Sequence, residues 1–184
     1  MKLSQARVLK SRMLYRGSVF GVRQDRVVEP GAIEATRDVV THSGSVVVLP
    51  VFPNGEILLI RQYRHAVGTS LWELVAGRID RGEAPLSAAR RELLEETGYT
   101  ARHFRRLLEI FPTPGFVAER MLIYLAEGLH PGPARPEADE RIVARRFSIS
   151  ALLRMMRTGA LRDGKSVAGI LYYLRFRPRR RTPS

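Results

Sequence analysis

The stretch GRIDRGEAPLSAARRELLEETGY, residues 77–99, concentrates carboxylates in a chain whose formal net charge is +13. Proline suits the first position of a helix, where its missing N–H has no intrahelical partner, and glycine suits the position after the last turn. Pro85 and Gly98 therefore predict a helix between them. The residues at helical spacing that we expect on its buried side are Leu86, Ala89, Leu93 and Thr97.

Three carboxylates share one face of that helix, because residues three and four positions apart are neighbours. Glu92, Glu95 and Glu96 stand in this relation and repel each other unless a cation lies among them. Clustered carboxylate oxygens suit Mg²⁺ or Mn²⁺, which bridge to phosphates. Arg91 can hold Glu95 in place from four residues away. A solvated surface helix with ordinary ion pairs would contain the same residues, so the helix alone leaves both interpretations open.

The remaining chain has strand patterns with a few helices. The continuous apolar run Ser45–Phe52 is typical of a strand buried on both faces, and Asn54-Gly55 predicts the turn after it. Because strands and helices do not alternate strictly, we predict an α+β fold in which helices cover a mixed sheet. Further strands are expected at 18–23, 36–41, 56–64, 71–77, 107–111, 121–128 and 142–149, and helices at 150–157 and 166–176.

Composition excludes several classes of protein. Cysteine is absent, which excludes disulfides and thiol catalysis and fits the cytoplasm. No apolar run reaches the roughly 18 residues of a membrane span, and the first residues lack the apolar region of a secretory signal, so we expect no membrane association. The basic residues are nearly all arginines. They indicate either a polyanionic substrate or partner, or an arginine bias spread over a solvated surface.

The spacing around the acidic helix is more specific than the helix itself. It reads Gly77, five residues, Glu83, seven residues, Arg91-Glu92-Leu93, one residue, Glu95-Glu96, one residue, Gly98-Tyr99. This resembles the Nudix box G-x5-E-x7-R-E-U-x-E-E-x-G-U, where U is a bulky apolar residue. Every fixed position matches, although Tyr99 stands where an aliphatic residue is more common. The resemblance implies an α/β/α Nudix sandwich that hydrolyses nucleoside diphosphates linked to another moiety.

The same resemblance assigns roles within the box. Glu92 and Glu96 would be the main metal ligands, assisted by Glu95 and by the backbone carbonyl of Ala76. They would hold about two or three Mg²⁺ or Mn²⁺ ions, which neutralise phosphate oxygens and lower the pKa of a bound water. The residues expected to shape the helix and its loop are Gly77, Glu83, Arg91 and Gly98.

Longer segments resemble the ADP-ribose pyrophosphatase group of the family. They are LYRGSVF (14–20), TRDVVTHSGSVVVLPV (36–51), RQYRHAVGTSLWELVAG (61–77) and FPTPGFVAERMLIYLAEGL (111–129). The group implies a homodimer in which a small N-terminal β subdomain, here 1–42, is swapped between subunits. A Nudix hydrolase domain at 43–176 and a basic tail at 177–184 would follow.

Substrate contacts follow from that resemblance. Arg37 and Arg64 would contact phosphates or riboses, with Arg61 and Arg78 as further candidates, although each arginine is also explained as a solvated charge. Glu119 would meet the terminal ribose or a metal-bound water. Pro114 stands about where the group has a diagnostic proline, and an N-terminal aromatic residue, Tyr15 or Phe20, would stack on adenine.

The catalytic base is expected in the loop at 130–140. The position expected for the base is Ala138, so Glu137 or Glu140 would replace it. Glu140 also stands where a metal ligand is expected. Arg146 departs from a tryptophan that is common in relatives, and we interpret it as a change at the surface or a dimer edge.

The predicted activity is Mg²⁺-dependent hydrolysis of ADP-ribose to AMP and ribose 5-phosphate. Hydrolysis of another nucleotide sugar, such as GDP-mannose or ADP-glucose, would use the same helix. A hydrolase of oxidised nucleoside triphosphates is disfavoured by the long segment before Ser45. A nucleic-acid-binding protein on the same scaffold is motivated by the arginines but not by any aromatic-basic alternation.

Overall fold

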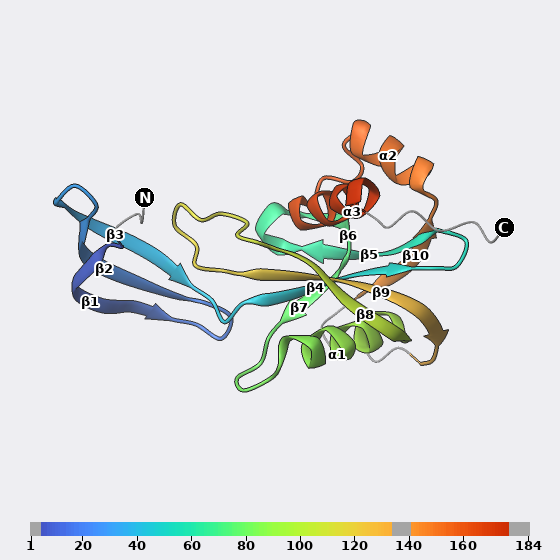
Figure 1. Ribbon diagram of the computed structural model, residues 1–184, viewed down its shortest axis with the longest axis horizontal. Coiled ribbons are helices and arrows are strands. Elements are labelled where there is room, and N and C mark those ends of the chain that lie inside the picture. The colour runs from blue at the N-terminus through green and yellow to red at the C-terminus, as the bar shows by residue number, and fades with distance from the viewer. Residues whose placement is uncertain (1–4, 134–140, 177–184) are drawn as a thin grey trace. The chain divides into compact units, whose positions relative to one another are not determined.

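The computed structural model describes residues 5–133 and 141–176. The chain forms two compact units, each described by itself below (Figure 1). The first unit consists of Met1–Gly44 and Phe111–Arg120, and the second of Ser45–Ile110 and Met121–Ser184. The boundary predicted after residue 42 remains a prediction, and the first unit also contains a segment from the middle of the chain.

The first unit is an antiparallel three-stranded sheet. Its strands, in spatial order, are β1 (Arg7–Arg16), β2 (Gly21–Glu29) and β3 (Ile33–Thr41). Gly31 and Ala32 both have positive φ in the turn between β2 and β3. Val117 forms an isolated parallel bridge with Val40, which places the 111–120 segment beside β3. The sequence pattern missed β1, because this strand is exposed along most of its length and has no alternation of apolar and polar residues. The strand predicted at 18–23 corresponds to β2, which begins at Gly21 and ends at Glu29.

The second unit contains a mixed sheet, as predicted. Within the described residues the main order is β10-β5-β4-β9-β8, with β6 paired to β5 and β7 paired to β4. Among the described strands of this sheet, β4 and β9 pair in parallel and the other neighbouring strands pair antiparallel. The strands are β4 (Ser45–Val51), β5 (Ile57–Arg64), β6 (Thr69–Glu73), β7 (Val75–Arg78), β8 (Tyr99–Ile110), β9 (Met121–Pro131) and β10 (Val143–Phe147), and a short 3-10 helix covers His65–Val67.

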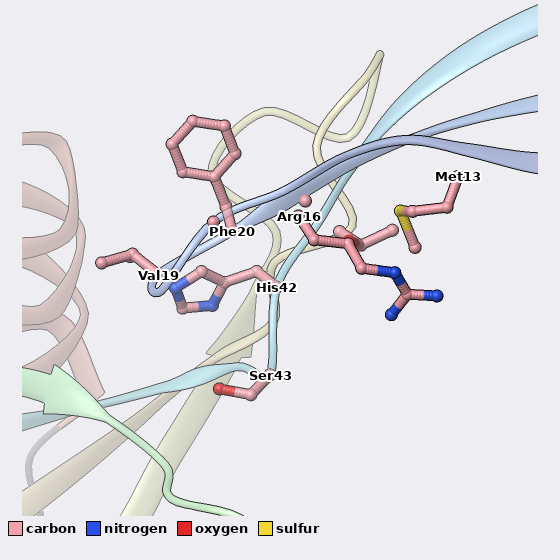
Figure 2. Close-up of a pocket in the computed structure, with 9 residues that line it drawn as sticks. Met13, Arg16, Val19, Phe20, His42 and Ser43 are labelled. Carbon is pink, nitrogen blue, oxygen red and sulfur yellow. The ribbon is translucent and has the colours of Figure 1, made fainter.

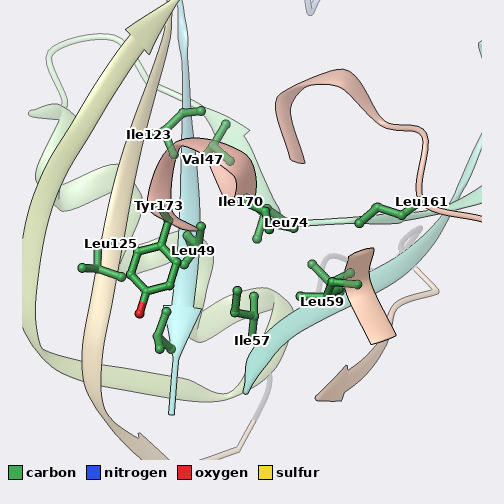
Figure 3. Close-up of a cluster of buried hydrophobic side chains, with 12 residues drawn as sticks. Val47, Leu49, Ile57, Leu59, Leu74, Ile123, Leu125, Leu161, Ile170 and Tyr173 are labelled. Atoms are coloured by element: carbon green, nitrogen blue, oxygen red, sulfur yellow. The ribbon is translucent and has the colours of Figure 1, made fainter. Parts of the chain in front are cut away.

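Helices cover both faces of this sheet (Figure 1). The odd-numbered residues of β4, such as Val47 and Leu49, pack with α2 (Ile149–Arg157) and α3 (Gly164–Phe176). Figure 3 shows this cluster. The even-numbered residues of β4 pack with α1 (Pro85–Thr97) on the other face. Strand β4 is therefore buried on both faces, as its apolar run predicts, and the second unit is an α/β/α sandwich.

The predicted helix is α1, with the predicted ends. Pro85 is its first residue, and Gly98 adopts the left-handed conformation with φ 73° while donating its N–H to the carbonyl of Leu94. Leu93 is fully buried, but Leu86 is 40% exposed, so its predicted burial is wrong. Leu86 has the angular position of the buried side. It lies in the first turn, however, before the first buried residue of the helix, Ala88.

None of the helices among the described residues is long and apolar enough to cross a membrane.

We predict that Leu93→Ala lowers the free energy of unfolding by about 2–5 kcal/mol, because it removes a fully buried side chain from between α1 and the sheet. The matched control is Leu86→Ala in the same helix. Because the Leu86 side chain is 40% exposed, we expect this change to lower the free energy of unfolding much less. Urea unfolding of both variants checks the prediction. Equal losses would contradict the assigned orientation of α1.

Candidate metal and substrate site

The guanidinium of Arg91 lies at the centre of the acidic face of α1. Its Nη1 donates to Oε1 of Glu92 at 2.6 Å and to Oε2 of Glu95 at 3.0 Å. Its Nε and Nη2 donate to the two carboxylate oxygens of Glu83 at 3.0 and 2.9 Å. Nη2 also donates to the backbone carbonyl of Arg78 at 3.1 Å. One side chain therefore joins the helix, the loop before it and the end of β7.

These contacts favour the charged forms of the groups involved. The hydrogen bond to Glu83 is the largest cause that raises the pKa of Arg91 above its usual value. The same hydrogen bond is the largest cause that lowers the pKa of Glu83, and the backbone N–H of Asp80 adds to it. Arg91 and Glu83 thus form an ion pair between the helix and the loop before it, and their role in shaping the site remains a prediction.

Strand β7 brings its backbone against two carboxylates of α1. The backbone N–H of Ala76 donates to Oε2 of Glu96 at 3.3 Å, and Glu96 is only 5% exposed. A Cβ added to Gly77 would lie 1.9 Å from Cδ of Glu92 and 2.0 Å from its Oε1. Glycine is therefore the residue that lets the Glu92 carboxylate lie against β7. Pairing of Ala76 and Gly77 with Val47 and Val46 of β4 holds this backbone in place.

The donors on α1 and β7 fit a hard divalent cation in their chemistry. Glu92, Glu95 and Glu96 offer carboxylate oxygens within one helical turn, which Mg²⁺ and Mn²⁺ prefer. In residues 5–133 and 141–176, no three His, Asp or Glu side chains are placed so that together they could hold an ion. The positive charge between Glu92 and Glu95 is that of Arg91. The metal ligands therefore remain a prediction that rests on donor chemistry.

Of the three arginines proposed for the substrate in the second unit, Arg64 is the most constrained. It ends β5 and forms a two-pronged ion pair with Glu73, from Nε at 2.8 Å and Nη2 at 2.9 Å. This hydrogen bonding is the largest cause that raises the pKa of Arg64, and the charge of Glu96 adds to the effect. Arg61 is exposed on β5, and Arg78 lies 3.9 Å from Asp80.

The first unit contains a cavity of about 280 Å³ that Phe20 helps to line (Figure 2). Arg16 and His42 line it as well, so aromatic, cationic and imidazole groups surround one space. The Tyr15 ring lies 5.7 Å from the Phe20 ring, centroid to centroid. Nδ1 of His42 accepts a hydrogen bond from the backbone N–H of Gly44, and it lies 3.7 Å from Oε1 of Glu119, another predicted substrate residue.

Two other predicted substrate residues of the first unit occupy exposed positions. Arg37 forms a two-pronged ion pair with Glu29, and this hydrogen bond is the largest cause that lowers the pKa of Glu29. Pro114 follows Thr113, whose carbonyl accepts hydrogen bonds from Phe116 and Val117.

The predicted site residues thus fall into three sets. Phe20, Arg37, Pro114 and Glu119 belong to the first unit, and the box residues with Ala76, Arg61 and Arg64 belong to the second. Glu137 and Glu140 lie outside the described residues.

Two of the departures from the family pattern, Tyr99 and Arg146, contact each other. Nη2 of Arg146 donates to the hydroxyl of Tyr99 at 2.8 Å, and the guanidinium lies 3.8 Å from the ring centroid of Phe52. Arg146 on β10 therefore packs over two aromatic rings, which the sequence interpretation of a surface or dimer-edge change did not foresee. The hydroxyl that an aliphatic residue would lack at position 99 is the group that Arg146 binds.

Sequence reasoning also missed Glu73 and Lys165, which ion-pair beside Arg64. The signal for Glu73 was available, because it is the one charged residue in LWELVAG (71–77), a run that was predicted to be a strand. The signal for Lys165 was not, because the pair joins residues 92 positions apart in the chain.

We predict that Gly77→Ala weakens Mn²⁺ binding by about ten-fold or more, because the new Cβ would displace the Glu92 carboxylate. The matched control is Gly115→Ala, where a Cβ would meet nothing within 4 Å. Manganese titration by electron paramagnetic resonance measures both affinities. Unchanged affinity in a folded Gly77→Ala protein would remove Glu92 from the metal site.

The sequence was compared with protein-family models and with proteins of known function. Residues 41–168 match the NUDIX domain family model. The chain is 37% identical over 167 residues to an ADP-ribose pyrophosphatase of Mycobacterium tuberculosis (strain ATCC 25618 / H37Rv), covering 89% of this chain and 80% of the relative. It is 34% identical over 143 residues to a GDP-mannose pyrophosphatase of Escherichia coli O1:K1 / APEC, covering 72% of this chain and 73% of that one.

A solved structure described as an ADP compounds hydrolase supports the fold, with a TM-score of 0.82 and coverage of 96% of both chains at 19% identity. The match to the family model over most of the chain, together with the box on α1, shows that this protein belongs to the Nudix hydrolase family.

Proposed function

We propose that the protein hydrolyses the pyrophosphate bond of ADP-ribose to AMP and ribose 5-phosphate with the help of Mg²⁺ or Mn²⁺. The observation that carries the proposal is the acidic turn of α1, whose Glu92 and Glu96 carboxylates lie against the backbone of β7 at Ala76 and Gly77. The M. tuberculosis relative, which carries the name ADP-ribose pyrophosphatase, supports this substrate over others.

The chemistry follows from the charge of the substrate. A pyrophosphate repels an incoming water, and divalent cations supply both charge neutralisation and a bound water of lowered pKa. Glu92 and Glu96 would hold the cations, with Glu95 and the carbonyl of Ala76 as further ligands. Arg91 would keep α1 fixed to the loop before it while the carboxylates bind. Water would attack one phosphorus, the bridging P–O bond would break, and the leaving phosphate would take up the electron pair.

The substrate's two phosphates would meet arginine side chains. Arg64 is the best placed in the second unit, because its ion pair with Glu73 fixes one edge of the guanidinium while its side chain is 37% exposed. In the first unit, the cavity beside Phe20 offers an aromatic ring, Arg16 and His42 for the adenosine part. Arg37 and Glu119 remain further proposed contacts.

Glu140 or Glu137 would accept the proton of the attacking water. We expect Glu140→Ala to reduce kcat and to remove the acidic limb of its pH profile, since a general base must be deprotonated to act. Ala138→Glu is the matched change in the same loop and should be tolerated or raise kcat. Steady-state kinetics from pH 5 to 9 separate these outcomes. Equal rates for wild type and both variants would remove this loop from the mechanism.

A homodimer is proposed because the first unit exposes many apolar side chains. A monomer rarely leaves a large apolar area in water, so a second copy is the expected cover. Sedimentation equilibrium should give twice the chain mass of 20.8 kDa, and a monomer at micromolar concentration would contradict the proposal. The exposed apolar residues of the first unit are Val8, Leu9, Leu14, Tyr15, Val19, Phe20, Ile33, Phe111 and Phe116.

Another nucleotide sugar is the second candidate substrate, because a GDP-mannose pyrophosphatase is also a relative. Turnover of ADP-ribose, ADP-glucose, GDP-mannose, NADH and 8-oxo-dGTP at fixed Mg²⁺ ranks the candidates by kcat/KM. We expect ADP-ribose to rank first. A protein that hydrolyses none of them but shifts nucleic acid in a salt-dependent gel assay would contradict the proposal.

We predict that Glu96→Gln lowers kcat by about a hundred-fold or more while the melting temperature changes little. The amide oxygen can still accept from Ala76, and loss of one charge relieves repulsion from the neighbouring carboxylates. The matched control is Glu109→Gln, which removes a carboxylate paired with Arg106 on β8. Full turnover by Glu96→Gln with Mg²⁺ present would show that the metal assignment is wrong.

A further inference from the structure

Glu73 is a buried carboxylate on the last residue of β6, outside the Nudix box. It is 1% exposed and stands opposite Ile60 of β5, and the apolar residues Trp72 and Leu74 flank it in the chain. A carboxylate buried this deeply requires cations and hydrogen bonds around it. The contacts of the Glu73 carboxylate therefore indicate why a charged residue, and not an apolar one, occupies this buried position.

Two cations approach Glu73 from different elements. Arg64, at the end of β5, uses its Nε and Nη2 to contact both carboxylate oxygens, at 2.8 and 2.9 Å. Lys165, in the first turn of α3, donates its Nζ to Oε2 of Glu73 and also to Oδ1 of Asp163. The cluster contains two positive and two negative charges, so its charges balance.

Asp163, the second carboxylate of the cluster, is connected to the sheet through Ser166. Asp163 accepts from the backbone N–H and the hydroxyl of Ser166, at 3.0 and 2.5 Å. The hydroxyl of Ser166 in turn accepts from the backbone N–H of Leu74 at 2.7 Å, and Ser166 is fully buried. Both the strand and the helix that carry the cluster are thus held, so Glu73 has little freedom to move.

A fixed Glu73 restricts the guanidinium of Arg64. Two parallel N–H···O bonds define both the position and the plane of the group. They engage only one edge, and a guanidinium has five N–H donors, so donors remain for a second anion. Burial would raise the pKa of Glu73, but the contacts with Arg64 and Lys165 outweigh it and lower the value. The pair therefore stays ionised while Arg64 binds elsewhere.

The position of Arg64 connects this pair to the acidic helix. Glu73 lies three residues before Ala76, whose N–H donates to Glu96 of α1. The charge of Glu96 is a smaller cause of the raised pKa of Arg64, after the hydrogen bond to Glu73. Arg64 therefore contacts a buried carboxylate in the same segment of chain that contacts Glu96, and part of its side chain is exposed. A diphosphate held by cations on α1 would meet an arginine whose orientation is already set.

We infer that Glu73 is a positioning residue, which holds the Arg64 guanidinium in place for the diphosphate of the substrate. The inference rests on the proposed function. It adds a residue that makes no contact with the substrate itself, and it gives the buried charge on β6 a role in substrate affinity.

A double-mutant cycle tests this role. Wild type, Glu73→Gln, Arg64→Ala and the double variant are compared by KM and kcat for ADP-ribose and by calorimetric Kd for α,β-methylene-ADP with Mg²⁺. Glu73→Gln should raise KM and Kd by about ten-fold, with kcat within about three-fold, because Arg64 loses its orientation. In the Arg64→Ala background the same change should have no further effect on Kd.

Lys165→Met is the matched control, because it removes the other cation of Glu73 and leaves the two bonds to Arg64. We expect a lower melting temperature with the affinity for α,β-methylene-ADP retained. Glu73→Asp, which keeps the charge but shortens the reach, replaces Glu73→Gln if that variant fails to fold.

The outcomes that overturn the inference are distinct from those that overturn the proposed function. Equal loss of affinity from Glu73→Gln with and without Arg64, or equal loss in Lys165→Met, would show a general structural effect and remove the inference alone. A wild-type protein that neither binds α,β-methylene-ADP nor hydrolyses any nucleotide sugar would remove the proposed function and the inference with it.

Discussion

The ion pairing of one arginine with three glutamates is the interaction on which the site depends. Arg91 contacts Glu83, Glu92 and Glu95 and also the backbone carbonyl of Arg78. Without it, carboxylates crowded on one helical turn would repel each other and the loop before α1 would lose its attachment. The contacts explain how a strongly basic chain can concentrate negative charge at one place and keep a regular helix there.

The sheet supplies the second constraint. Because β4 is buried on both faces, its alternate residues define two cores, one under α1 and one under α2 and α3. Strand β7 pairs with β4 and so carries Ala76 and Gly77 to the carboxylates of α1. The neighbouring strand β6 ends at Glu73, which is tied to α3 through Lys165. Helix α1 therefore contacts β7 and helix α3 contacts β6. These two strands follow one another in the chain, so both helical layers are attached to the segment 73–77.

Local chemistry accounts for what the sequence predicted well. The ends of α1 follow from Pro85 and Gly98, and the burial of β4 follows from a continuous apolar run, so neither needs knowledge of distant residues. The resemblance to the Nudix box added the α/β/α arrangement and the family, which the comparisons confirm. The roles of individual site residues remain predictions.

What the sequence did not predict depends on contacts between distant residues. Strand β1 is exposed and has no apolar alternation, so only its pairing with β2 defines it. Leu86 has the right helical phase but lies in the first turn, before the buried part of α1 begins. The meeting of Arg146 with Tyr99, and of Lys165 with Glu73, joins residues 47 and 92 positions apart, which no local pattern reveals.

The central claim is that the carboxylates of α1 hold divalent cations against a diphosphate. Anomalous diffraction from crystals grown with Mn²⁺ and α,β-methylene-ADP tests it most directly. The account predicts manganese peaks bounded by Glu92, Glu96 and the carbonyl of Ala76, with the phosphates beside them. Phosphates bound elsewhere, with no manganese peak at that turn, would contradict it.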